Sequence, residues 1–148
     1  MSAALLSLDD RVAVAGQLKP GDMTEIASAG YVAVVNNRPD GEALFGQPRT
    51  EDLRTAAEAA GLIFLDLPFS GPRATPEQVR AFAELLAERP GPVVAFCKSG
   101  MRSALLWGAA AIASGRSLDD VLATAMRAGQ NLEPLGETMV ALAQSARS

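Results

Sequence analysis

The sequence contains no histidine and a single cysteine, Cys97, among its 148 residues. Without histidine there is no Cys-His pair, no Ser-His-Asp triad and no metal site built on histidine ligands. One cysteine cannot form an intrachain disulfide, and it does not by itself make a zinc site. We therefore expect no metal and no cofactor. Any chemistry must rely on cysteine, carboxylates, the cations of arginine and lysine, and backbone amides.

Positive charge and long apolar runs are also scarce. The chain has 13 lysines and arginines against 17 acidic residues, a formal net charge of -4. This balance gives no general attraction to phosphate backbones or anionic lipids, so we expect no nucleic-acid and no membrane partner. Runs such as 92–96 and 104–113 are shorter than the roughly 20 residues of a membrane span. The first residues lack the features of a signal peptide, which predicts a cytoplasmic location.

Apolar, β-branched runs predict four strands separated by helices. The strands cover residues 11–15, interpreted as a short edge strand, 31–36, 62–67 and 92–96. Helical patterns with start and stop signals cover residues 20–28, 50–60, 76–88, 101–113, 118–128 and 134–146. This alternation predicts a three-layer α/β/α fold with a mostly parallel sheet of four or five strands. The ordinary hydrophobic content, 49%, predicts that residues 1–148 form one domain.

Three segments directly follow predicted strands and should meet at one edge of the sheet. They are residues 36–38, residues 68–71 and the loop that begins at Cys97. Ligands of open α/β sheets bind outside the carboxyl ends of the strands, so we expect a binding crevice there. Asn37 and Arg38 would lie at its rim and could bind an anionic acceptor. The alternative is that they only order the turn.

The loop C-K-S-G-M-R-S after the third long strand carries the strongest functional signal. Cys97 directly follows the strand, Gly100 permits a tight turn, and a helix begins about four residues after the cysteine. Amides in such a turn converge with the helix N-terminus into an anion-binding concavity, and its positive potential favours a thiolate nucleophile. Arg102 offers a planar fork to an oxyanion or a charged sulfur species. The alternative is a packed core thiol.

The remaining residues of this loop are candidates for binding the substrate. They are Lys98, Ser99, Gly100, Met101 and Ser103. Ser103 is placed to donate its hydroxyl to the thiolate or to stabilise it as a leaving group. Lys98 could steer an anion toward the site, although an isolated lysine is more often part of the solvated surface.

Several stretches resemble the beta-lactamase hydrolase-like, phosphatase-like domain family, which shares the cysteine-phosphatase fold and is also described as a sulfur transferase/phosphatase family. They are V-A-G-Q-L (14–18), V-N-N-R-P-D-G-E (35–42), L-D-L-P-F-S-G (65–71), T-P-E-Q-V (75–79) and F-C-K-S-G-M-R-S-A (96–104). The resemblance implies a cysteine-phosphatase-like fold. It also implies a nucleophile at Cys97 and an anion-binding arginine at Arg102.

Two features move the expected chemistry from phosphorus to sulfur. Cysteine phosphatases have five residues between the cysteine and the arginine, whereas four separate Cys97 from Arg102, as in the loop of rhodaneses. The segment 68–73, where a phosphatase acid could be delivered, contains no carboxylate. Asp66 is the nearest candidate general acid, but it lies inside a predicted strand. Glu42 and its neighbour Asp40 are expected to serve the local turn.

The sequence thus predicts a sulfurtransferase in which a Cys97 persulfide carries sulfane sulfur from thiosulfate or a small persulfide to a thiol or sulfite. The first alternative is a phosphatase that forms a phosphocysteine. The second is a non-catalytic module that binds an anionic or persulfidated partner. The expected ligand is a small anionic or persulfide substrate, and a sulfur-oxidation enzyme is an expected partner. The oligomeric state is not indicated.

Overall fold

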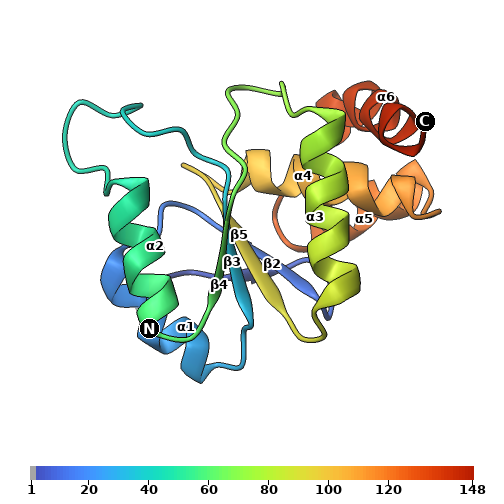
Figure 1. Cartoon of the computed structure of the whole chain (residues 1–148). Helices are drawn as coiled ribbons and strands as arrows, with labels where there is room; N and C mark the ends of the chain where they lie inside the picture. Colours follow the sequence, from blue (N-terminus) through green and yellow to red (C-terminus); the bar gives the residue numbers. More distant parts are fainter. Residues whose placement is uncertain (1–2) are drawn as a thin grey trace.

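A five-stranded sheet lies between two layers of helices in the computed structural model, which describes residues 3–148 (Figure 1). The strands are β1 (Leu6–Ser7), β2 (Val12–Ala15), β3 (Ala33–Asn36), β4 (Ile63–Asp66) and β5 (Val93–Phe96). Their order is β1-β2-β5-β3-β4, and only β1 runs antiparallel to its neighbour. The predicted three-layer α/β/α fold with a mostly parallel sheet is confirmed.

The central strand β5 shows why these runs form strands. All four of its residues are buried, because the sheet is covered on both faces. Val93 and Ala95 belong to one core, and Val94 and Phe96 belong to the core on the other face. Successive side chains of a strand point to opposite faces, so one short apolar run contributes to both cores.

The predicted edge position of residues 11–15 is wrong. β1 pairs with β2, with Leu6 opposite Val14 and Ser7 opposite Ala13, so β2 lies inside the sheet. β1 has two residues, too few to show the alternation by which a strand is found in a sequence.

Two helices cover one face of the sheet and four lie on the other (Figure 1). The first pair is α1 (Met23–Ser28), preceded by the 3₁₀ turn η1 (Pro20–Asp22), and α2 (Thr50–Ala59). The other layer contains α3 (Pro76–Glu88), α4 (Met101–Ala113), α5 (Leu118–Arg127), the 3₁₀ turn η2 (Glu133–Leu135) and α6 (Gly136–Arg147). These bounds lie close to the predicted ones. Thr75 caps α3 by accepting a bond from the Gln78 amide.

The carboxyl ends of β3, β4 and β5 meet at one edge, where backbone bonds hold the loops that follow them together. The Asn37 amide donates to the Phe96 carbonyl at 2.8 Å, and the Phe69 amide donates to the Asn37 carbonyl at 3.2 Å. The Cys97 amide donates to the Ala15 carbonyl at 3.2 Å. The segments predicted to converge are therefore neighbours.

None of the helices within residues 3–148 has the length and apolar character needed to cross a membrane.

Candidate active site

Cys97 lies at the junction between β5 and α4 and is 1% exposed. Its sulfur accepts a hydrogen bond from the Gly100 amide at 3.1 Å. An amide directed at a sulfur stabilises negative charge on it, and the N-terminus of the 13-residue helix α4 adds a favourable partial charge. The thiol is thus buried, as in a packed core, yet it carries the contacts expected of a reactive thiolate.

The shape of this loop depends on two glycines. Gly100 adopts a φ of 95°, a left-handed conformation that other residues rarely adopt, and this turns its amide toward Cys97. Gly16, just after β2, faces the carbonyl oxygen of Lys98, which would lie 3.0 Å from a Cβ at position 16. A side chain at position 16 would press on the loop that holds the sulfur.

Arg102 lies in the first turn of α4 and reaches across the site. Its Nη1 donates to Glu42 Oε2 at 2.7 Å and to the Phe69 carbonyl at 3.0 Å, and its Nη2 donates to Glu42 Oε1 at 2.9 Å. Hydrogen bonds to Glu42 raise the pKa of Arg102, and the charge of Cys97 contributes in the same direction. The guanidinium thus lies close enough to the sulfur for the two groups to influence each other electrostatically.

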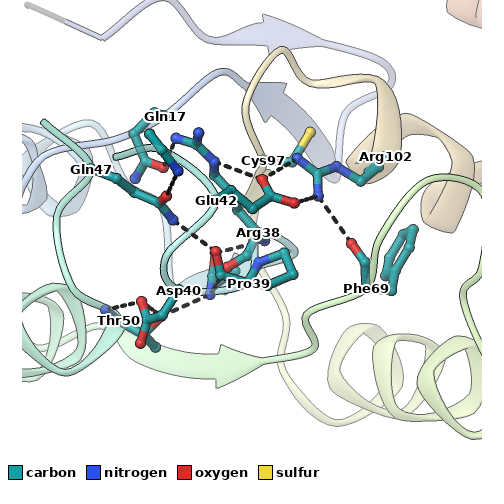
Figure 2. A network of polar contacts seen from close by, with 12 residues as sticks. Gln17, Arg38, Pro39, Asp40, Glu42, Gln47, Thr50, Phe69, Cys97 and Arg102 are labelled. Carbon is teal, nitrogen blue, oxygen red and sulfur yellow. Dashed lines mark hydrogen bonds and ion pairs between the residues drawn. The ribbon is translucent and has the colours of Figure 1, made fainter. Parts of the chain in front are cut away.

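Glu42 lies between two arginines, as Figure 2 shows. Its Oε1 also accepts a bond from Arg38 Nε at 2.9 Å, and Arg38 Nη1 donates to Gln17 at 2.9 Å. The hydrogen bond from Arg102 is the largest cause that lowers the pKa of Glu42 to about 2; Arg38 adds to it, and burial opposes it. Glu42 is thus ionised at neutral pH and cannot supply a proton there.

Sequence reasoning gave Glu42 little weight because it follows a turn. The loop that carries it is fixed at two points: Asp40 accepts two bonds from Thr50 at 2.8 Å, and the Gln47 side chain donates to the Pro39 carbonyl at 2.8 Å (Figure 2). The feature that could have indicated Glu42 is the place of β3 in the sheet. Because β3 and β5 are neighbours, the loop after β3 begins beside the Cys97 loop.

Asn37 and Ser103, both predicted to bind substrate, are hydrogen-bonded to each other. The Ser103 hydroxyl donates to Asn37 Oδ1 at 2.8 Å, and Asn37 Nδ2 donates to the Leu67 carbonyl at 2.9 Å. Both residues are fully buried. The Ser103 side chain lies between α4 and the sheet, where its hydroxyl satisfies the buried amide oxygen of Asn37. The pair joins three segments of the site: α4 and the loops that follow β3 and β4.

The structure also corrects the expectation that Asp66 could be a general acid. It accepts a hydrogen bond from Asn36 Nδ2 at 2.8 Å, and alternation along β4 places it on the same face as Phe64, in the layer of α1 and α2. Val93 and Ala95 belong to the core on the other face of the sheet. Continued alternation along the chain places Cys97 on that same face. Asp66 therefore faces away from the sulfur and cannot serve as its general acid.

Two hollows adjoin Arg102. One, of about 430 Å³, has a mostly charged lining: Arg38, Glu42, Ala43, Gly71, Lys98 and Arg102. The other, of about 270 Å³, has a mostly apolar lining: Gly71, Pro72, Ser99, Met101, Arg102, Leu105 and Leu135. The predicted binding residues Arg38 and Lys98 thus belong to the charged hollow, and Ser99 and Met101 to the apolar one. The Arg38 guanidinium also orders the turn, which was the alternative interpretation.

This arrangement joins a buried sulfur, an amide donor and an arginine at the start of a helix. It can receive an anionic or electrophilic group at the sulfur and stabilise the charge that develops there. Among residues 3–148, the three carboxylates weighed as proton donors are engaged elsewhere: Asp66 with Asn36, Glu42 with two arginines and Asp40 with Thr50.

Solved structures place this architecture among the cysteine-phosphatase-like folds. A protein from Neisseria meningitidis, described as a candidate phosphatase, is 32% identical, with a TM-score of 0.79 over 93% of this chain and 96% of that one. Tk-PTP in its active form is 21% identical, with a TM-score of 0.74 over 99% and 98%. PTPMT1 in complex with PI(5)P is 18% identical, with a TM-score of 0.67 over 96% and 98%. The last two show likeness of fold.

The chain belongs to the family described as beta-lactamase hydrolase-like protein, phosphatase-like domain, whose model matches residues 4–114. A beta-lactamase hydrolase-like protein from Agrobacterium fabrum is 39% identical over 100 residues, which are 68% of this chain and 23% of that protein. Another from Xylella fastidiosa is 32% identical over 116 residues, 78% of this chain and 27% of that protein. The chain spans about a quarter of the length of these relatives.

Proposed function

We propose that this domain is a cysteine-dependent sulfurtransferase. In the first step, the Cys97 thiolate attacks the outer sulfur of a donor such as thiosulfate. The bond between the two sulfurs of the donor breaks, and sulfite leaves with the electron pair. Cys97 then carries a persulfide. In the second step, an acceptor thiolate or sulfite attacks the terminal sulfur and regenerates the thiolate, so no external oxidant or reductant is needed.

One observation carries this proposal over its main competitor: no carboxylic acid among the candidates is available to protonate a leaving group at Cys97. Asp66 lies on the opposite face of the sheet, Glu42 is ionised in its contacts with two arginines, and Asp40 accepts two hydrogen bonds from Thr50. Expelling an alkoxide without an acid forgoes a rate factor of about 10² to 10⁴. Sulfite and thiolates are stable anions and leave without a proton.

The second candidate is a phosphatase that forms a phosphocysteine. The family description and the candidate phosphatase from Neisseria meningitidis support it, and neither names sulfur transfer. They support a cysteine-phosphatase-like enzyme in general, and the choice of sulfur rests on the site of this chain. Without an acid, phosphoryl transfer would be restricted to esters with stable leaving groups, such as aryl phosphates.

Two rates measured on the same preparation separate the candidates. Thiocyanate formation from thiosulfate and cyanide should exceed the background of Cys97→Ser, whereas hydrolysis of p-nitrophenyl phosphate should be near that background. Fast, Cys97-dependent phosphate release with no thiocyanate would establish the phosphatase. If neither activity exceeds the background while the chain still binds an anion, the non-catalytic binding module is favoured. The cytoplasmic location and a sulfur-oxidation partner enzyme remain proposals.

A further inference from the structure

The two hollows beside Arg102 differ in chemistry, although they share Arg102 and Gly71. Arg38, Glu42 and Lys98 give the larger one its charge. In the smaller one, Arg102 is the one charged side chain among the described residues that line it. Arg102 therefore lies at a boundary between a charged and an apolar surface. An inorganic anion bound at Arg102 would leave the apolar hollow unfilled.

The apolar hollow is large enough for an organic group. Its volume is about 270 Å³, and an enclosed cavity of roughly 150 Å³ lined by apolar side chains holds a benzene molecule. Its walls come from three separate parts of the chain: Pro72 follows β4, Met101 and Leu105 belong to α4, and Leu135 ends η2. Met101 lines this hollow and is 43% exposed, so its side chain is accessible to a ligand.

We propose that this hollow binds an apolar or aromatic group of the substrate, joined by a short link to the anionic or sulfane group that reaches Cys97 and Arg102. The physiological sulfur donor is then an organic persulfide or thiosulfonate rather than inorganic thiosulfate. This inference rests on the proposed function for the identity of the reacting group. The preference for an organic anion rests on the hollow alone.

Binding of unreactive anions tests the preference without any turnover. Methanesulfonate and benzenesulfonate carry the same charged group and differ in the apolar part. Calorimetric titration of the whole chain should give a dissociation constant about tenfold or more lower for benzenesulfonate, because the ring is removed from water in the hollow. Since neither anion reacts, a failure of sulfur transfer would leave this result unaffected.

Matched variants place the ring. Met101→Gln keeps the length of the side chain and makes it polar, so the preference for benzenesulfonate should fall at least threefold. Leu135→Gln, at a lining residue from another part of the chain, should act in the same direction. Met126→Gln changes another exposed methionine, 53% exposed and outside the lining, and should leave the preference as in the unchanged chain.

Equal affinity for the two anions in the unchanged chain would overturn the proposal, and so would a preference that survives both Met101→Gln and Leu135→Gln. If neither anion binds at concentrations up to about 10 mM, the proposal is also overturned, because Arg102 would then provide no anion site beside the hollow.

Discussion

Glu42 holds Arg102 through two parallel hydrogen bonds, of 2.7 and 2.9 Å, although the residues are sixty positions apart in the sequence. The contacts use Nη1 and Nη2 and leave Nε outside the pair. A bidentate pair fixes both the position and the plane of a guanidinium. Glu42 thus fixes the Arg102 guanidinium at the start of α4.

The first prediction concerns the pH dependence of this pair. The pKa of Glu42 is lowered from 4.5 to about 2 in the folded protein. A lowered folded-state pKa contributes stability that is complete above the unfolded value and is lost as pH falls toward the folded value. The stability advantage of the unchanged chain over Glu42→Gln should therefore shrink as pH falls from about 5 toward about 2, measured by urea unfolding at low salt. An advantage that stays constant or grows toward low pH would contradict the assigned pair.

Asp66→Asn tests the absence of a general acid. Because Asp66 faces the layer of α1 and α2 and bonds Asn36, its conversion to an amide should leave sulfur transfer within about threefold of the unchanged chain. The rate of thiocyanate formation is the measurement. A loss of about 10² or more, in a variant that still unfolds cooperatively, would return Asp66 to the reaction.

Ser103→Ala should act on stability. The change leaves the buried oxygen of Asn37 without its donor, which costs about 1–3 kcal/mol. Ser114→Ala is the matched control: its hydroxyl donates to the Ala111 carbonyl at an exposed position, so its cost should be within about 0.5 kcal/mol. Urea unfolding measures both. Equal, small costs would mean that the bond between Ser103 and Asn37 contributes little.

Much of the fold could be predicted from the sequence because its signals are local. The apolar runs and the capping residue Thr75 lie inside the elements that they define, so the parallel sheet and the main helices follow. β1 was missed because its two residues are too few to show the alternation of apolar and polar side chains that indicates a strand. Cys97 and Arg102 could be predicted to lie together because only four residues separate them in the sequence. Glu42 and the bond between Ser103 and Asn37 depend on which loops the sheet order brings together, and local patterns do not encode that order.

Gly100→Ala tests the loop that holds the sulfur. A φ of 95° strains any other residue, by roughly 1–2 kcal/mol, and a Cβ there would lie 3.1 Å from Gln130 Nε2. Gly115→Ala carries similar backbone strain, at a φ of 113° with open space around it, at the end of α4. Both should lower stability, but only Gly100→Ala should lower sulfur transfer, because its amide contacts Cys97. Equal activity losses would refute a specific role for the loop.

The central claim is that Cys97 carries the transferred sulfur, and the mass of the intact protein tests it most directly. After brief exposure to an organic persulfide or thiosulfate and removal of the donor, the chain should gain about 32 Da, one sulfur atom. The gain should be absent in Cys97→Ser and should disappear when an acceptor thiol is added. A chain that gains no sulfur from either donor, and instead gains about 80 Da from an aryl phosphate at Cys97, would contradict the account.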